Sequence, residues 1–347
     1  MVLKINKTNE MIKENEMQKD IQLLGLGNAL VDIQFEVNDS EVDLFSLEKG
    51  TMTLVNKTIQ KNILDYLGNR TNYKSSGGSA ANTIIGFSSF GGKAAYKTML
   101  GEDDFGRFYA KEFHNLGIVL DAKYDYDEHT GICFVLITPD SERTLVTALG
   151  ATAKHGREHI DDNLIKRAEW LYVEGYKFSE GAGYEAINHS VDIAQKFETK
   201  IAVTLSDKFI IDVFRNNLDV VLEKSDLIFC NELEAKTYAN THSVNEAFNV
   251  LTSKFKNIAM TMGAEGSLVK WDDQVYEIPA YKTKAIDTTG AGDMYAAGFM
   301  YGITHANNPV KAGHLGSISA SKVVSQYGAR LTESHTNLRD MIFSMNF

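Results

Sequence analysis

The sequence predicts an α/β protein in which a mostly parallel central sheet is covered by helices on both faces. Short apolar runs, typical of buried strands, alternate with segments of helical periodicity at about 30 residues per unit. The predicted strands are residues 170–173, 201–205, 227–230 and 258–262, and the clearest helical patterns span 186–197 and 244–255. Ligands of such sheets bind beyond the carboxyl ends of the strands. We therefore expect the functional site at that edge.

The first half of the chain begins the same sheet and then departs from the alternation. Residues 21–26 are the first predicted strand, and a glycine-rich element at 75–83 leads into an apolar helix at 84–90. Two segments, at about 35–55 and 130–150, break the rhythm. We expect them to form a small β-sheet lid over the ligand site.

The second of these segments contains a predicted hairpin, with strands at 131–139 and 143–149 joined by a polar turn. The first 19 residues are polar and lack an apolar core, so they predict a loose N-terminal extension rather than a secretory signal. The remaining residues, 20–347, are expected to form one domain with the lid segments inserted.

Composition excludes several classes of protein. The chain has 347 residues, 44% of them hydrophobic, and a net charge of -11, which argues against a general nucleic-acid binder. Its two cysteines lie far apart, which predicts buried thiols in a reducing compartment. No apolar run reaches about 18 residues, so no membrane partner is expected. The expected location is the cytoplasm.

The most informative stretch is Asp-Thr-Thr-Gly-Ala-Gly-Asp at positions 287–293, which is predicted to end a strand and to open an apolar helix. Gly290, Ala291 and Gly292 carry little or no side chain, so a ligand can approach their N–H groups at the positive end of the helix dipole. Asp293 places a carboxylate beside this anion pocket. That pairing suits phosphoryl transfer, in which the carboxylate takes a proton from the attacking hydroxyl. The alternative is an Asp that caps a glycine-rich turn.

Two N-terminal elements carry polar groups that can hold an acceptor. Gly25-Leu-Gly-Asn28 half resembles a dinucleotide fingerprint, but Leu30 stands where the third glycine is required. Asn28 and Asp32 can instead bind a ligand with several hydroxyls, because Asp accepts from two vicinal hydroxyls and Asn both donates and accepts.

The second N-terminal element is Ser-Gly-Gly-Ser-Ala-Ala-Asn at 76–82. Gly77 and Gly78 let the backbone touch a ligand or turn tightly, and Asn82 is expected to face the cleft from the first turn of the next helix. A plain glycine-rich helix start is the alternative for this element.

Two further motifs follow strands of the second half. Asn231 and Glu234 come after the strand that ends at Cys230, where a carboxylate could hold the water shell of Mg²⁺. An ordinary acidic first turn of a helix is the alternative. Thr261, with Gly263 and Gly266 after it, resembles a nucleotide-binding turn.

These motifs and their order resemble the ribokinase-like, or PfkB, family of sugar and nucleoside kinases, over roughly residues 20–332. The resemblance implies a three-layer α/β/α sandwich with a mostly parallel sheet and a β lid, and it implies the use of ATP and Mg²⁺. It implies that Asp293 is the catalytic base and that Gly290, Ala291 and Gly292 form the anion hole. A nucleoside or a sugar is then the partner, bound by a monomer or a homodimer.

The resemblance also implies roles for other residues. Asn231 and Glu234 would serve phosphate and Mg²⁺, and Thr261, Gly263 and Gly266 would form an ATP-binding turn. ATP would also lie near Gly328. Asp287 and Thr289 are candidates for holding a monovalent cation such as K⁺.

Within the family, residues 27–32 are similar to the start of adenosine kinases. This implies that Asn28 and Asp32 meet ribose hydroxyls and that Leu30 lies under the adenine ring. Phe134 or Tyr176 could cover the other face of a base, although core packing is the alternative for each. Sugar kinases of the family share the hydroxyl-binding residues, so a free sugar remains an alternative acceptor.

Two other classes of function compete with a kinase. A nicotinamide-dependent oxidoreductase would need the third glycine that Leu30 replaces. A non-catalytic binder on the same fold would not need Asp293 beside the anion loop. A sequence that keeps both the loop and the carboxylate therefore favours phosphoryl transfer.

Overall fold

The computed structural model describes residues 19–68, 70, 73–140 and 142–347. The predicted polar extension at 1–19 lies outside the described residues except for Lys19. Among the described residues, no helix has both the length and the apolar character needed to cross a bilayer.

A nine-stranded sheet forms the centre of the molecule, in the order β14-β13-β12-β11-β10-β9-β1-β5-β6. From β12 to β6 every neighbouring pair is parallel, and β13 and β14 add an antiparallel edge. The strands are β1 (Ile21–Leu26), β5 (Ala94–Gly101), β6 (Val119–Asp125), β9 (Ala168–Glu174), β10 (Lys200–Thr204), β11 (Leu227–Asn231), β12 (Ile258–Thr261), β13 (Ser267–Trp271) and β14 (Gln274–Ile278). The first predicted strand and those at 170–173, 201–205, 227–230 and 258–262 are confirmed. The strand predicted to end at the 287–293 motif is wrong, because residues 279–290 reach α11 as an irregular segment.

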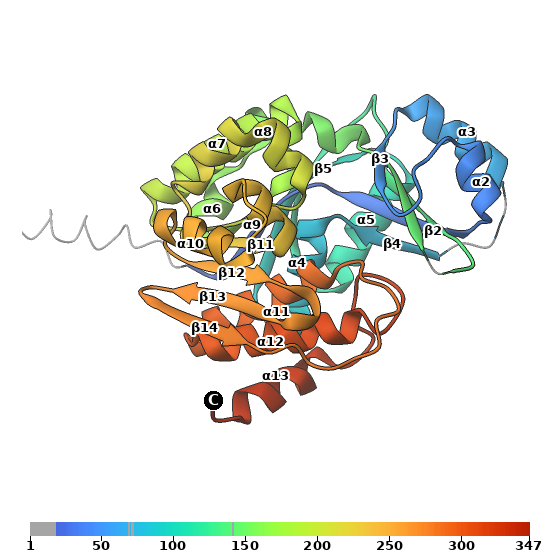
Figure 1. Ribbon diagram of the computed structural model, residues 1–347. Coiled ribbons are helices and arrows are strands. Elements are labelled where there is room, and N and C mark those ends of the chain that lie inside the picture. The colour runs from blue at the N-terminus through green and yellow to red at the C-terminus, as the bar shows by residue number, and fades with distance from the viewer. Residues whose placement is uncertain (1–18, 69, 71–72, 141) are drawn as a thin grey trace, which may run out of the picture.

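Helices cover both faces of this sheet (Figure 1). One face carries α4 (Ser79–Ser89), α5 (Asp104–Asn115), α11 (Ala291–Ala306), α12 (Pro309–Val323) and α13 (His335–Ser344). The other carries α6 (Asp162–Arg167), α7 (Gly181–Lys196), α8 (Lys208–Leu222), α9 (Glu232–Ala239) and α10 (Val244–Lys254). Adjacent residues of β1 show the division, because Leu23 packs in the first core and Leu24 in the second. The predicted three-layer α/β/α sandwich is confirmed.

A second, five-stranded sheet has the order β3-β8-β7-β2-β4 and lies to one side of the sandwich (Figure 1). Its strands are β2 (Leu30–Glu36), β3 (Met52–Leu54), β4 (Tyr73–Gly77), β7 (Gly131–Ile137) and β8 (Arg143–Ala148), with α2 (Asp39–Leu44) and α3 (Lys57–Leu67) between them in sequence. The predicted hairpin is β7–β8, which pairs antiparallel.

The second sheet is larger than the sequence predicted. The segment at 35–55 contributes mainly α2 and the three residues of β3, whereas β2 and β4 were not predicted as strands. Strand β2 follows β1 almost directly and pairs with β4 and β7. It therefore carries the chain from the large sheet into the second sheet, and Asp32 lies on it.

Candidate active site

A cavity of about 370 Å³ lies between the carboxyl ends of the large sheet and the inner face of the second sheet. This volume is within the range of small-molecule sites. Its walls include the ends of β9, β10, β11 and β12, the start of α4 and the start of α11. Predicted site residues that line it are Asn28, Leu30, Asp32, Gly78, Asn82, Asn231, Glu234, Thr261, Thr289, Gly290, Ala291, Gly292 and Asp293.

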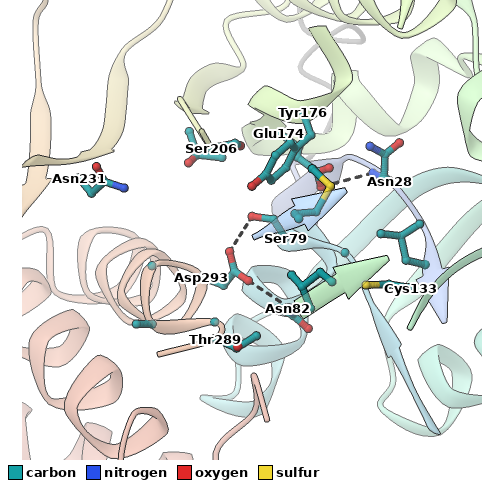
Figure 2. Close-up of a pocket in the computed structure, with 18 of the residues that line it drawn as sticks. Asn28, Ser79, Asn82, Cys133, Glu174, Tyr176, Ser206, Asn231, Thr289 and Asp293 are labelled. Carbon is teal, nitrogen blue, oxygen red and sulfur yellow. Dashed lines mark hydrogen bonds between the residues drawn. The ribbon is translucent and has the colours of Figure 1, made fainter. Parts of the chain in front are cut away.

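Asp293 lies in the first turn of α11 and points at the start of α4 (Figure 2). Its carboxylate accepts hydrogen bonds from Ser79 Oγ at 2.6 Å and from Asn82 Nδ2 at 3.1 Å. Burial raises the pKa of the carboxyl to about 6, although these two hydrogen bonds act in the opposite direction. No described residue forms an ion pair with Asp293. The carboxylate is therefore held in place yet remains available as a base near neutral pH.

The turn before α11 presents backbone amides to the cavity. Gly290 is the N-cap with φ +75°, and a Cβ there would lie 2.6 Å from Ala329, so only glycine fits. The Ala291 amide donates to the Thr288 carbonyl at 3.2 Å. Among the described residues, the amides of Gly292 and Asp293 have no acceptor, as is usual for a first helical turn. A Cβ on Gly292 would meet no protein atom within 4 Å, so the protein's own packing does not explain this glycine.

Asp287 lies behind this turn and does not line the cavity. One of its oxygens accepts from Thr289 N at 3.0 Å, and the other from Gly328 N at 2.8 Å. The second oxygen also lies 2.8 Å from Arg143 Nη2 on β8, and both side chains are buried. Arg143 Nε and Nη2 form no aligned hydrogen bond to a described residue, so the contact is coulombic. One carboxylate thus joins the turn, the second sheet and the Gly328 backbone.

Asp32 lies on β2, where the second sheet lines the cavity. Burial is the main reason that the pKa of its carboxyl is raised to about 7, and the Arg330 guanidinium counteracts part of that effect. A Cβ on Gly77 would lie 2.2 Å from an Asp32 carboxylate oxygen. Gly77 therefore makes room for the Asp32 side chain rather than lining the cavity itself, whereas Gly78 does line it.

The inner face of the second sheet adds an apolar wall beside Asp32. In the strand register Asp32 lies opposite Cys133, Cys133 opposite Thr147 and Thr147 opposite Leu54. The next row of cavity residues is Val135, Leu145 and Met52. Phe134, one of two candidate covers for a base, faces away from the cavity and packs against Phe35, so the core-packing alternative holds for it. Tyr176 does line the cavity.

Glu174, at the end of β9, is a cavity residue that sequence reasoning missed. Its Oε2 accepts from the backbone amides of Ala80 at 2.9 Å and Asn28 at 3.3 Å. Burial raises the pKa of its carboxyl to about 7. The available signal was a charged residue directly after an apolar strand, at the sheet edge where ligands bind.

The opposite side of the cavity contains Asn231, Glu234 and Thr261. Asn231 and Glu234 form a capping box, in which Glu234 N donates to Asn231 Oδ1 at 2.8 Å and Glu234 Oε2 accepts from Asn231 N at 3.0 Å. Glu234 Oε1 accepts from Asn231 Nδ2 at 2.7 Å, and burial raises the pKa of the Glu234 carboxyl to about 7. The predicted turn residues Gly263 and Gly266, and also Gly328, lie outside the cavity lining.

A cavity of this kind, with free helix N-terminal amides next to a positioned carboxylate, defines a phosphotransferase that acts on an alcohol group. The family comparison agrees, because residues 63–336 match the pfkB family of carbohydrate kinases. The chain belongs to this family.

Relatives within the family include both nucleoside and sugar kinases. Adenosine kinase 1 of Arabidopsis thaliana is 25% identical over 336 residues, which cover 90% of this chain and 96% of that protein. The 5-dehydro-2-deoxygluconokinase of Listeria innocua is 30% identical over 271 residues, covering 73% of this chain and 82% of the relative. The structure of adenosine kinase from Sinorhizobium meliloti has a TM-score of 0.86 and 30% identity, with coverage of 92% and 99%. The probable sugar kinase of Rhizobium etli has a TM-score of 0.87 and 30% identity, with coverage of 94% and 99%.

Proposed function

We propose that the protein is an ATP-dependent nucleoside kinase that transfers the γ-phosphate to the primary hydroxyl of a ribose nucleoside, with adenosine as the preferred acceptor. The observation that carries this proposal is the apolar wall next to Asp32. Its apolar side chains are Cys133, Val135, Leu145, Met52 and Leu54. The Thr147 hydroxyl among them donates to Cys133 Sγ. A nucleobase can cover such a wall, whereas a free sugar would leave its own hydroxyls facing apolar side chains.

In this proposal Asp32 and Asn28 hold the ribose diol, and the primary hydroxyl points toward Asp293. Asp293 orients that hydroxyl and takes its proton as the bond to phosphorus forms. The free amides of Gly292 and Asp293 stabilise the charge on the transferring phosphoryl group. Ser79 and Asn82 keep the Asp293 carboxylate in one orientation. Closure by the second sheet would exclude water and limit wasteful ATP hydrolysis.

The nucleotide side of the proposal rests on Asn231, Glu234 and Thr261, which line the cavity across from Asp32. Both Glu234 oxygens already accept hydrogen bonds within the capping box, so this carboxylate suits a hydrated Mg²⁺ better than direct coordination. Bound there, Mg²⁺ would neutralise phosphate charge. Gly263, Gly266 and Gly328 stay proposed as backbone contacts of ATP beyond the cavity lining.

A monovalent cation such as K⁺ is the last component of the proposed site. Asp287 and Thr289 remain its candidate ligands, but the Asp287 carboxylate already contacts the Arg143 guanidinium. A K⁺ ion would have to share that carboxylate with an existing positive charge. We therefore expect only a small change in turnover when K⁺ replaces a bulky organic cation.

The second candidate function is phosphorylation of a free sugar, which the 5-dehydro-2-deoxygluconokinase relative favours. An ATP-consumption assay over nucleosides and free sugars decides between the two. We expect kcat/KM for adenosine to exceed that for any free sugar by about 100-fold or more. Burying a nucleobase against apolar side chains contributes about 3 kcal/mol of binding free energy, which corresponds to that factor. A free sugar that matches or exceeds adenosine would overturn the nucleoside assignment.

The proposal also includes a cytoplasmic location, which the two free, buried cysteines support. Whether the protein is a monomer or a homodimer is measured by light scattering on the purified chain.

A further inference from the structure

A buried lysine lies directly behind the acceptor side of the cavity. Lys177 is on the short helix that follows β9, Gly175–Ser179, and its side chain is fully inaccessible to solvent. Its Nζ contacts Glu180 Oε2 at 2.6 Å, the Thr152 carbonyl at 3.0 Å and Asn28 Oδ1 at 3.1 Å. These are three acceptors for three ammonium protons, so the hydrogen-bonding capacity of Lys177 is filled.

This contact fixes which way the Asn28 amide faces. An ammonium group can only donate, so the Asn28 atom next to Lys177 Nζ must be the carbonyl oxygen and not the NH₂ group. Thr152 Oγ donates to the same oxygen at 3.1 Å while it accepts from Ala29 N at 3.3 Å. A reversed amide would place its NH₂ group against the Lys177 ammonium. Asn28 Oδ1 therefore accepts from Lys177 and Thr152 inside the protein and faces away from a ligand.

The other end of the amide is free. Among the described residues, Asn28 Nδ2 has no hydrogen-bond acceptor, although the residue is only 2% exposed and lines the cavity. Asp32, on the same side of the cavity, is an acceptor when ionised. The acceptor site thus offers one fixed donor and one acceptor. A vicinal diol matches this pair, because one hydroxyl can donate to Asp32 while an oxygen accepts from Asn28.

We propose that Lys177 is a positioning residue that fixes Asn28 as a hydrogen-bond donor and thereby sets the preference of the acceptor site for an intact ribose diol. This inference rests on the proposed nucleoside kinase function. If Lys177 has this role, replacing it changes the ratio of kcat/KM between acceptors and not only the stability of the fold.

The test compares adenosine with its 2′-deoxy and 3′-deoxy analogues in the wild-type protein and in Lys177→Met. The substitution keeps an unbranched side chain and removes the ammonium. Only the Thr152 hydroxyl then still holds the Asn28 oxygen, and a hydroxyl can rotate to accept from a reversed amide. We expect the ratio of kcat/KM for adenosine to that for the more weakly used deoxy analogue to fall about tenfold, the worth of one oriented hydrogen bond.

A matched control is Lys97→Met. Lys97 is equally buried and pairs with Asp121, but neither residue lines the cavity. We expect the control to keep the wild-type ratio, whatever it does to thermal stability. A single Lys177→Met substitution leaves Glu180 as an unpaired buried carboxylate, so Lys177→Met/Glu180→Gln is made in parallel to preserve folding.

The outcomes are distinct. If the wild-type protein phosphorylates adenosine and the folded Lys177 variants keep its discrimination ratio, the inference is wrong and the kinase assignment stands. An equal loss of discrimination in Lys97→Met would also overturn it, because general loosening would then explain the effect. If the wild-type protein phosphorylates no nucleoside, the proposed function itself fails before the variants are compared.

Discussion

At the scale of single residues, the site depends on which glycines the fold requires and which it does not. Gly290 has φ +75° and packs against Ala329, so the fold requires it. Gly292 lies in the first turn of α11, and a Cβ there would meet only open space. A glycine that the protein's packing does not explain, on the wall of a cavity, is explained by a ligand that approaches its backbone.

Gly292→Ala is therefore expected to fold at least as well as the wild type, because alanine is the better helix former by roughly 0.5–1 kcal/mol. Its phosphoryl transfer should fall by about 100-fold or more, because the methyl group occupies the space next to the phosphate-binding amides. Gly290→Ala is the matched variant and should lower the free energy of unfolding. Urea unfolding and initial rates measured on both variants check this. A fully active Gly292→Ala would contradict the anion-hole assignment.

The acid limb of the pH profile follows from Asp293. Burial raises the pKa of this carboxyl to about 6, and only the ionised form can accept the proton. We expect kcat/KM to begin to fall below about pH 7, where Asp32 is protonated, and to fall more steeply below about 6, where Asp293 is protonated. Ser79→Ala removes a hydrogen bond that lowers this pKa, so the limb should move to higher pH. A limb that stays in place in Ser79→Ala would indicate that another group controls the profile.

At the scale of elements, the ion pair between Arg143 on β8 and Asp287 links the second sheet to the turn at 287–292, before α11. Both partners are buried, and Asp287 also binds the amides of Thr289 and Gly328. The turn proposed to bind phosphate is thus tied to the second sheet, which forms one wall of the cavity.

Arg143→Met should lower the free energy of unfolding by about 3–5 kcal/mol, because it leaves the Asp287 carboxylate buried and unpaired. Arg107→Met breaks an exposed pair with Glu102 and Asp104 and should cost less than about 1 kcal/mol. Chemical denaturation of both variants makes the comparison. Equal, small effects would show that the Arg143 contact does not hold the turn.

Sequence patterns predicted the large sheet better than the second one, for a physical reason. The strands of the large sheet are buried on both faces and appear as apolar runs such as 227–230. Strand β2 instead alternates, since Asp32 and Gln34 face one side while Ile33 and Phe35 face the core. Strand β4 is short and polar, and its pairing with β2 depends on contacts distant in sequence.

The same limit applies to the site. The motif at 287–293 can be recognised from consecutive residues alone, because glycines and the start of a helix are visible in the sequence. The ion pair of Arg143 with Asp287 and the contact of Lys177 with Asn28 are not, because each joins segments far apart in the chain. Glu174 was missed because its burial depends on neighbours from α4.

At the scale of the whole molecule, the cavity places several carboxyls where ionisation is costly. Burial raises the pKa of Asp32, Glu174, Glu234 and Asp293. Between their ordinary pKa values of about 4 and these raised values, the folded protein binds more protons than the unfolded chain. Each group therefore lowers stability as the pH rises from about 4 toward 7. Buried histidines such as His155, whose pKa burial lowers, have the opposite effect on stability at low pH. Single variants are therefore needed to isolate one carboxyl.

Asp293→Asn isolates the carboxyl that is proposed as the catalytic base. Its pKa is raised from 3.8 to about 6, which corresponds to roughly 3 kcal/mol of cost when the group is ionised. The variant should thus be more stable than the wild type at about pH 8, and the difference should shrink as the pH falls through 6 toward 4. Urea unfolding at several pH values measures it. A stability difference that does not change with pH would contradict the assigned pKa shift.

The turnover of the same variant tests the central claim, which is that Asp293 orients an acceptor hydroxyl and takes its proton next to the amides proposed to bind phosphate. Asparagine keeps an oxygen for the Asn82 hydrogen bond but cannot take the proton. We predict that Asp293→Asn is folded, still binds adenosine, and forms AMP at least about 10³-fold more slowly than the wild type. Near-normal turnover by this folded variant would contradict the account.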